Sequence, residues 1–542
     1  MRGSRHKCVE EIDSLPRVPS WFDSSSKEKC LPHTRVSILN SIQSRLAQGH
    51  SSFIWLRGSP GTGKSTIAKT ITASLEEEKR LASVIYFDKT FGHDNAFSAL
   101  HFVSSIAYQI AKFNSVFCEA LGRILSEDGG IRKHADSAGH IEQLLKKPLS
   151  HLPPSLTTTS WVVVIDALDE CGSRAELRQL MDMLAKFAEL PLSFLVTSRP
   201  EPEVVDHMNG PKLSLRVTVE DLDAADQAST DRDILEVVGT RIQRLSNHHD
   251  RAWPPSNEQL AQFVARCSGL FEIASILLRR LERSYAYGLL ASKQFETILT
   301  EADGVASDTD AALYSEYWRI LDRAYPVGNS KETQEGLRRY HLVVGSLVLL
   351  QEPLAAVALA DLLSMTEDDV RATLMPLGSV ILVPESDPIS FYHASFHEFL
   401  VPSSGDQHLS DEKSSARIQY RIVIQERVTH LASQCLEIMN AKLAYNILNL
   451  PKLFVLNKRI HDLDEQLNTH VPYHLRYVVL HWAAHLAQSG DLAQLRSLLC
   501  HWCEGKMIFY LELMSLLGRC DVIFPLLDYA IGWAQVRSII QS

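Results

Sequence analysis

The chain has 542 residues, of which 45% are hydrophobic and 22% are charged, and its formal net charge is −11. This composition is ordinary for a soluble globular protein, and the length predicts several domains. The excess of acids, 65 against 54 bases, argues against a chain that coats nucleic acid or an anionic membrane.

Cysteine usage and the N-terminus bear on the compartment. Nine cysteines are spread irregularly along the chain, which is typical of reduced thiols inside a cell and not of a disulfide framework. The N-terminal residues lack the apolar core of a secretory signal, and no apolar run approaches the ~20 residues that a membrane-spanning helix needs. We therefore expect a cytoplasmic protein without a transmembrane segment.

Two regions of different pattern make up the first 210 residues. Residues 1–30 are polar and too short for a domain, so we expect a tail or linker. From 31 to 210, the apolar runs "FIWLR", "SVIYF", "WVVVIDAL" and "SFLVTS" alternate with segments of helical periodicity. Short apolar runs separated by helices predict an α/β domain around a buried parallel sheet.

The rest of the chain is predicted to be mainly helical. Residues 211–330 contain amphipathic helical patterns, which predict a helical domain. From 331 to 405, three helical segments precede two short strands, and these are the parts of a winged-helix domain. Residues 406–542 have helical patterns throughout, so we expect an all-α C-terminal region.

A glycine-rich segment, "GSPGTGKST", lies between the run "FIWLR" and a helical pattern. It fits the phosphate-loop pattern G-x-x-x-x-G-K-[ST], and a strand before and a helix after are the context this loop requires. Gly58, Gly61 and Gly63 allow backbone angles and a close approach that a Cβ atom would block. The backbone N–H groups are then able to point at phosphate oxygens, and the dipole of the following helix adds to the attraction.

Three side chains at the end of this loop complete the pattern. Lys64 supplies a cation for the β- and γ-phosphates, Ser65 offers a hydroxyl to Mg²⁺, and Thr66 places a second hydroxyl nearby. The alternative is a glycine-rich turn with a structural role only, which requires neither the lysine nor the serine. We predict a nucleotide site whose phosphate-binding residues are Gly58, Ser59, Pro60, Gly61, Thr62, Gly63, Lys64, Ser65 and Thr66.

Acidic residues follow the apolar run Trp161–Ile165. Asp166 comes directly after the run, and Asp169 and Glu170 follow at the carboxyl end of the predicted strand, where ligands lie in open α/β sheets. We expect Asp166 to hold Mg²⁺, through water, and Asp169 or Glu170 to orient or deprotonate the attacking water. The alternative is a solvated acidic turn, and the phosphate loop upstream favours the functional interpretation.

The last apolar run of the α/β region, "LSFLVTS", is followed by Arg199. A guanidinium group suits phosphate oxygens, so we expect Arg199 to sense the γ-phosphate. The alternative is an arginine that caps a surface loop, and the order of the strands favours the sensor. The predicted catalytic residues are Lys64, Asp166, Asp169, Glu170 and Arg199.

The phosphate loop, the acidic strand end and the strand before Arg199, in this order, resemble the motifs of NACHT NTPases, the NLR-like signalling ATPases of the STAND class. The sequences of the motifs are most similar to those of fungal members. The resemblance implies a switch that binds ATP or ADP with Mg²⁺, in which slow hydrolysis controls oligomerisation. It also implies a role in fungal non-self recognition or cell death, with protein partners or other copies of the chain as partners. No effector domain or repeat sensor is evident in the sequence.

Segments outside the core extend the resemblance. The segment "CLPHTRVSILNSI" is similar to the family's adenine-side segment, which implies that Thr34 and Arg35 lie near the base. In "CSGLFEIA", Phe271 stands where many relatives have a proline that packs on adenine. The segment "ISFYHASFHEFL" resembles the end of the family's winged helix, which implies that His393 reaches the β-phosphate of bound ADP.

Two other motifs have the spacing of metal or redox sites. His481 and His485 in "HWAAH" lack the glutamate of a zinc-protease helix, so we interpret them as ordinary helix histidines. Cys500 and Cys503 form a single C-x-x-C without a second pair, which we interpret as buried thiols.

Alternatives to a signalling switch remain at this point. The chain is either a switch, a P-loop phosphotransferase for a small substrate, or a nucleotide-binding scaffold without turnover. DNA binding by the winged helix is disfavoured, because the predicted recognition helix begins with Glu367, Asp368 and Asp369, and we expect no nucleic-acid partner. The absence of a guanine-reading N/TKxD motif favours adenine nucleotides.

Overall fold

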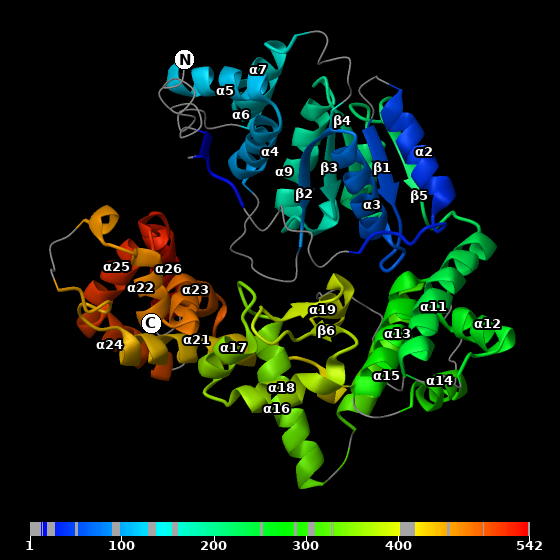
Figure 1. Cartoon of the computed structure of the whole chain (residues 1–542). Coiled ribbons are helices and arrows are strands. Elements are labelled where there is room, and N and C mark those ends of the chain that lie inside the picture. The colour runs from blue at the N-terminus through cyan, green and yellow to red at the C-terminus, as the bar shows by residue number, and fades with distance from the viewer. Residues whose placement is uncertain are drawn as a thin grey trace. The chain divides into compact units, whose positions relative to one another are not determined.

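The structure is a computed structural model (Figure 1). It describes residues 12–13, 15–18, 28–48, 53–88, 98–127, 137–153, 161–249, 253–286, 290–301, 309–326, 328, 330–401, 418–451, 456–490 and 493–539. These residues divide into two compact units, the first ending at Ser315 and the second beginning at Glu316. Within the described ranges, no helix has both the length and the hydropathy that a bilayer crossing needs.

A parallel sheet of five strands forms the centre of the first unit. Its strands are β1 (Phe53–Arg57), β2 (Leu81–Tyr86), β3 (Val162–Asp166), β4 (Ser193–Ser198) and β5 (Val217–Asp221). They lie in the order β2-β3-β4-β1-β5, so β1 pairs with β4 on one side and β5 on the other. The predicted α/β fold with a parallel sheet is therefore confirmed.

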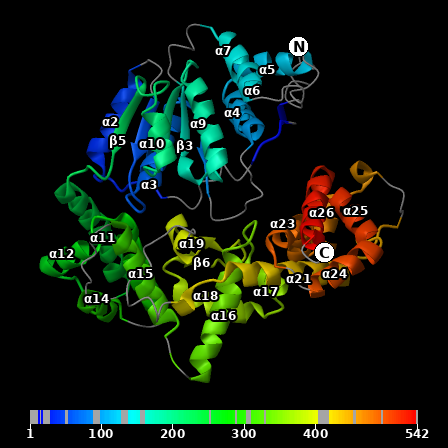
Figure 2. The ribbon, with the colours of Figure 1, turned by 180° about the vertical axis from the view of Figure 1, so that it is seen from behind.

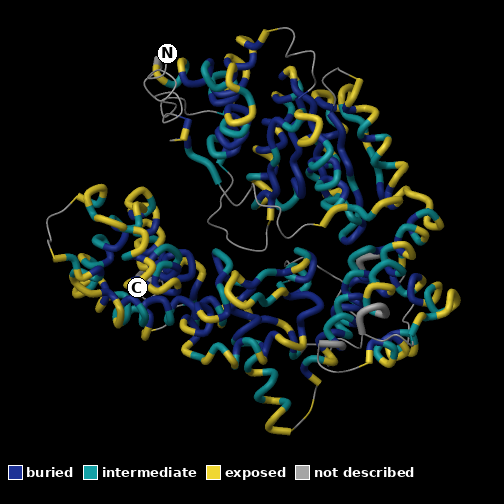
Figure 3. The backbone as a smooth tube through the Cα atoms, viewed as in Figure 1, coloured by how far each residue is buried: buried dark blue, intermediate teal, exposed yellow. Residues whose placement is uncertain are grey.

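Helices cover both faces of this sheet (Figures 1 and 2). The helices in question are α2 (Val36–Ala47) and α3 (Lys64–Glu77) on one face, and α4 (Ala99–Phe113) and α9 (Arg174–Phe187) on the other. Val162 and Val164 of β3 pack with α2 and α3, whereas Val163 and Ile165 pack with α4 and α9. Because both faces of β3 are buried, its sequence is a continuous apolar run (Figure 3).

The first unit contains further helices around and after the sheet. They are α5 (Ser115–Glu127), α6 (Ser137–Ile141), α7 (Lys147–Ser150), α10 (Pro202–Met208), α11 (Gln227–His249), α12 (Asn257–Arg266), α13 (Phe271–Ala286) and α14 (Ala291–Thr300). The next helix, α15 (Thr309–Ala324), contains the boundary between the two units.

Two features of the first unit differ from the prediction. β5 lies beyond residue 210, where we placed the end of the core, because its mostly half-buried residues lack the apolar run of the inner strands. Ile12 and Leu15 belong to the segment predicted as a polar tail, yet they are 2% and 5% exposed within the hydrophobic cluster that includes α4. Two apolar residues are too few to produce a periodic pattern, so this packing could not be predicted from hydrophobic periodicity.

The second unit begins with three helices and a hairpin. These are α16 (Lys331–Leu347), α17 (Ala356–Leu363), α18 (Glu367–Leu374), the antiparallel strands β6 (Ile381–Leu382) and β7 (Ser390–Phe391), and then α19 (Ala394–Leu400). The order of elements is the one predicted for residues 331–405, and their assignment as a winged helix stays a prediction. In the acidic first turn of α18, Asp369 pairs with Arg339 and Glu367 pairs with Arg371, each at 2.7 Å.

Helices also make up the last described part of the chain. They are α21 (Ile424–Lys442), α22 (Leu463–His470), α23 (Tyr473–Gln488), α24 (Ala493–Gly505), α25 (Met507–Leu516) and α26 (Ile523–Ile539). His485 is buried and its Nε2 lies 2.8 Å from Tyr477 Oη, which agrees with a structural histidine. Cys500 and Cys503 are exposed on α24, so the prediction that they are buried was wrong: the single C-x-x-C gave no information on which face of the helix they occupy.

The start of α9 offers a test of the fold. Ser173 forms a capping box with Glu176, in which each side chain accepts a hydrogen bond from the other residue's backbone N–H. We expect Ser173→Ala to lower the free energy of unfolding of the first unit by about 1 kcal/mol, measured by urea denaturation. Gln179→Ala, an exposed change within the same helix, is the control and should have little effect. An equal loss in both variants would contradict the capping role.

Candidate nucleotide-binding site

The predicted phosphate loop connects β1 to α3. β1 ends at Arg57, and α3 begins at Lys64, so residues 58–63 form the turn between them. Gly61 and Gly63 have φ angles of +77° and +96°, which are left-handed values that favour glycine. Ser65 and Thr66 lie in the first turn of α3 and are half-buried. The loop thus presents the start of a helix at the carboxyl edge of a parallel sheet, where anions bind.

Lys64 lies back against the loop in this structure. Its Nζ donates to the carbonyl oxygens of Gly58 at 2.6 Å and Ser59 at 2.9 Å. Burial lowers the pKa of Lys64, while the Asp169 carboxylate raises it, the Arg199 guanidinium lowers it, and Asp223 and Asp166 raise it. The lysine therefore shares one electrostatic environment with the acids and the arginine that the sequence predicted for the site.

Asp166 ends β3 as a carboxylate that is 0% exposed. Thr197, from the neighbouring strand β4, donates its hydroxyl to Asp166 Oδ1 at 2.5 Å and accepts from the backbone N–H of Ala167 at 2.9 Å. Ala167 has a left-handed φ of 56°, and there the chain leaves the strand. Asp166 is therefore held in place by β4, and its role as a ligand of Mg²⁺ stays a prediction.

Asp169 and Arg199 form an ion pair between the ends of β3 and β4. The backbone N–H of Arg199 donates to Asp169 Oδ1 at 3.0 Å, and Arg199 Nε lies 3.3 Å from Asp169 Oδ2. Their side chains are only 15% and 6% exposed. A pair this sheltered is screened less by salt than a surface pair. Glu170 follows Asp169 in a short 3-10 turn, so both predicted acids lie at the same strand end.

The segment before β1 also reaches the phosphate loop. Arg35 donates from Nη2 to the carbonyl oxygen of Thr62 at 2.8 Å, and its guanidinium carbon lies 4.7 Å from the centroid of the Phe271 ring. Its backbone N–H donates to Asp233 of α11 at 3.1 Å. Thr34, by contrast, donates its hydroxyl within its own turn, to the Leu31 carbonyl at 2.8 Å. Arg35 thus joins the loop to α11 and α13.

The first turn of α13 packs directly against the phosphate loop. The backbone N–H of Glu272 donates to the Gly61 carbonyl at 3.2 Å, and a Cβ atom on Gly61 would lie 2.8 Å from Glu272 Cβ. The Glu272 carboxylate pairs with Arg279 at 2.7 Å, and burial raises its pKa while Arg279 lowers it. Phe271, which stands where the resembled family often has a proline, also lies near the loop. Its Cδ2 atom is 3.9 Å from the position that a Cβ atom on Gly63 would take.

Sequence reasoning missed an acid that contacts the loop. Both carboxylate oxygens of Asp223 lie 2.9 Å from the backbone N of Ser59, and one accepts from the Ser59 hydroxyl at 3.1 Å. Asp223 follows β5, next to β1 in the sheet, and the failure to predict β5 hid this signal. The role of Thr197 was also missed, although it lies in a predicted strand two residues before the predicted Arg199.

His393 lies in the second unit, at the N-terminal end of α19. Its side chain accepts a hydrogen bond from the backbone N–H of Ser395 at 3.1 Å. The contact between His393 and a nucleotide stays a prediction.

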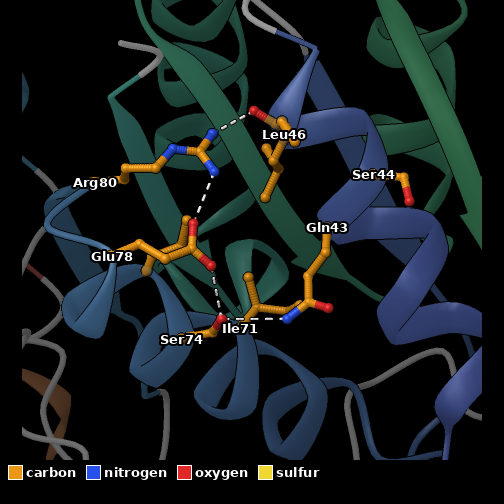
Figure 4. Close-up of a pocket in the computed structure, with 9 residues that line it drawn as sticks. Gln43, Ser44, Leu46, Ile71, Ser74, Glu78 and Arg80 are labelled. Atoms are coloured by element: carbon orange, nitrogen blue, oxygen red, sulfur yellow. Dashed lines mark hydrogen bonds and ion pairs between the residues drawn. The ribbon is translucent and has the colours of Figure 1, made fainter.

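A separate cavity of about 310 Å³ lies between α2 and α3 (Figure 4). The close-up shows a chain of polar contacts along it, in which Gln43 donates to Ser74 at 3.2 Å and Ser74 donates to Glu78 at 3.0 Å. Arg80 pairs with Glu78 at 2.9 Å and also donates to the Leu46 carbonyl. The lining residues come from the C-terminal halves of α2 and α3 and from the turn between α3 and β2, which holds Glu78 and Arg80, so the cavity does not include the phosphate loop.

One family model matches part of the first unit. The family model described as Nephrocystin 3, N-terminal, matches residues 34–199, a range that begins at Thr34 and ends at Arg199. No curated protein matches the chain. The matched range spans less than a third of the chain and includes the predicted phosphate loop, Asp166 and Arg199.

The solved structures that align with this chain have low sequence identity and low TM-scores. A STAND-class signal transduction ATPase with a tetratricopeptide-repeat sensor from Pyrococcus horikoshii has a TM-score of 0.37 at 12% identity, covering 98% of this chain and 66% of its own. The Orc1 protein of Aeropyrum pernix in complex with DNA has a TM-score of 0.33 at 16% identity, covering 72% and 94%. Drosophila ORC bound to DNA has a TM-score of 0.30 at 14% identity, covering 64% and 86%.

The contact between Gly61 and α13 offers a test of the site. Gly61→Ala places a Cβ atom against Glu272 and strains a left-handed backbone, so we expect nucleotide affinity to fall at least tenfold, or about 1.4 kcal/mol, by isothermal titration calorimetry with ADP. Gly239→Ala in α11 is the matched control, because no atom lies within 4 Å of its new Cβ. It should bind ADP normally and be no less stable. Normal affinity in Gly61→Ala would contradict the close packing.

Proposed function

We propose that this protein is a nucleotide-dependent signalling switch of the NACHT and STAND type, operated by ATP and ADP. The observation that carries the proposal is the contact between the phosphate loop and the first turn of α13. Because α13 packs against the loop, a movement of the loop on phosphate binding would also displace α13. A conventional phosphotransferase has no need of such a contact, whereas a switch depends on one.

The residues of the site suit Mg²⁺ bound together with a nucleotide. Ser65 offers a hydroxyl at the start of α3 and Asp166 a buried carboxylate at the end of β3, and oxygen ligands of this kind are those that Mg²⁺ prefers. The metal would neutralise charge on the phosphates. On nucleotide binding, the Lys64 ammonium would break its hydrogen bonds to the carbonyls of Gly58 and Ser59 and would bind phosphate oxygens instead. The backbone N–H groups of the glycine-rich loop would donate further hydrogen bonds to the phosphates.

The ion pair between Asp169 and Arg199 supports a sensing step. A γ-phosphate within reach of Arg199 would compete with Asp169 for the guanidinium, because phosphate accepts its hydrogen bonds in the same bidentate manner as a carboxylate. Release from Arg199 would leave Asp169, together with Glu170, to orient or deprotonate a water. As the family resemblance implies, hydrolysis would be slow, and it would return the switch to its ADP form.

The switch would have two states with different contacts. In the resting state, ADP would hold the second unit through His393 at the β-phosphate, as the family resemblance implies. Exchange for ATP would favour another arrangement through Arg199, and the open form would oligomerise. We place this switch in the cytoplasm and, from the resemblance, in fungal non-self recognition or cell death. DNA is not a proposed partner, because the first turn of α18 carries three acids, Glu367, Asp368 and Asp369, which disfavour contact with DNA phosphates.

Two substitutions separate binding from turnover. Lys64→Ala should abolish the binding of both ATP and ADP, since it removes the cation of the loop. Asp166→Ala should preserve ADP binding but remove Mg²⁺-dependent hydrolysis, measured as phosphate release. Asp182→Ala, an exposed acid on α9, is the control for the loss of a negative charge. Undiminished hydrolysis by Asp166→Ala would show that the metal assignment is wrong.

The latch is tested by the rate at which ADP leaves. His393→Ala should release a fluorescent ADP analogue at least about tenfold faster in stopped-flow experiments, because a hydrogen bond to a charged phosphate is lost. The affinity for a non-hydrolysable ATP analogue should be unchanged. His470→Ala, at an exposed histidine of α22, serves as the control. Equal ADP release from wild type and His393→Ala would exclude the latch.

A further inference from the structure

A short chain of hydrogen bonds links three side chains of the second unit. His393 Nδ1 lies 3.1 Å from the backbone N of Ser395 and 2.5 Å from the Ser395 hydroxyl oxygen. The same hydroxyl lies 2.7 Å from Tyr317 Oη, which belongs to α15. Ser395 and Tyr317 are both 0% exposed, so their hydroxyls satisfy one another away from bulk water.

The directions of these bonds follow from the backbone. A backbone N–H is always a donor, so Nδ1 of His393 must accept and cannot carry a proton. The Ser395 hydroxyl is then also a donor to Nδ1, and its own oxygen accepts from the Tyr317 hydroxyl. A neutral imidazole whose Nδ1 is an acceptor carries its proton on Nε2. The chain of bonds therefore selects one tautomer of His393.

The packing around Tyr317 holds this arrangement. Its ring lies against Phe396 at 4.9 Å and Phe399 at 5.2 Å between ring centroids, and both phenylalanines belong to α19, the helix that His393 begins. The Tyr317 hydroxyl is therefore directed at Ser395 by contacts on its own ring. A buried hydroxyl costs stability unless it is bonded, so the pair Tyr317 and Ser395 is a specific feature of this core.

We propose that Tyr317 and Ser395 are positioning residues that fix His393 as the neutral tautomer with its proton on Nε2. This inference rests on the proposed function for its purpose: an Nε2–H donor is what a phosphate oxygen of ADP requires. A proton on Nδ1 would point at the backbone N–H of Ser395, and the two donors would repel each other. The arrangement therefore disfavours the imidazolium form and leaves Nε2–H as the one donor of the ring.

The test is the ring nitrogen spectrum of His393 in the full chain. With ¹⁵N-labelled histidine, long-range proton–nitrogen correlation distinguishes the Nε2–H tautomer, the Nδ1–H tautomer and imidazolium. His393→Gln identifies the signals. We expect the wild type at neutral pH to show the Nε2–H pattern alone. A wild-type spectrum with the Nδ1–H tautomer or imidazolium would overturn the proposal without any need for a variant.

Matched variants then separate positioning from packing. Ser395→Ala removes the hydroxyl that bonds Nδ1, and Tyr317→Phe retains the ring but removes the donor to Ser395. Both variants lose or weaken one donor to Nδ1 but keep the backbone N–H of residue 395. We therefore expect the Nε2–H tautomer to remain the main form at His393, accompanied by a measurable fraction of other forms that the wild type lacks. Ser395→Thr, which retains a hydroxyl, should keep the wild-type pattern. We also expect ADP release to be about threefold faster in the first two variants, the size of effect of losing one neutral hydrogen bond. An unchanged His393 spectrum in Ser395→Ala would contradict the inference.

The result is distinguishable from a failure of the latch. If the tautomer changes in the variants as expected while His393→Ala releases ADP at the wild-type rate, the positioning of His393 stands and the proposed contact with the nucleotide fails. If His393→Ala releases ADP faster but Ser395→Ala and Tyr317→Phe leave the spectrum unchanged, the latch stands and the positioning role fails.

Discussion

The close approach of α13 to the phosphate loop depends on the missing side chain of Gly61. A Cβ atom there would lie 2.8 Å from Glu272 Cβ, so the helix reaches the loop only because this residue is glycine. Arg35 adds a second link, since it bonds the Thr62 carbonyl and Asp233 while it lies over Phe271. The predicted phosphate loop therefore packs against α13 and is linked through Arg35 to α11, so its conformation depends on both helices.

The ends of β3 and β4 supply the charges of the site as a set of mutually bonded groups. Thr197 bonds Asp166 and Arg199 pairs with Asp169, so two of the three predicted acids are held from β4 or its end. In the proposed switch, an arriving phosphate would have to exchange contacts with groups that are already engaged. The same logic extends to Lys64, which now bonds the loop's own carbonyls.

Much of the site followed from the sequence, and the exceptions have physical causes. The strands β1, β3 and β4 were predictable because burial on both faces requires continuous apolar runs, and Lys64, Asp166 and Arg199 follow from their ends. β5 was not predictable, because its residues are mostly half-buried and do not form an apolar run. Asp223, which follows β5, was therefore not predicted either. Tyr317 and Ser395 are 78 residues apart, and a hydrogen bond over that distance leaves no local pattern in one sequence.

The most direct test of the switch is the nucleotide that the purified protein already carries. Freshly purified chain is denatured, and the released nucleotide is identified and quantified by chromatography. A switch held in its resting state by ADP predicts stoichiometric ADP. An empty site on a monomer that turns over ATP rapidly would contradict it and would identify the protein as a conventional P-loop enzyme.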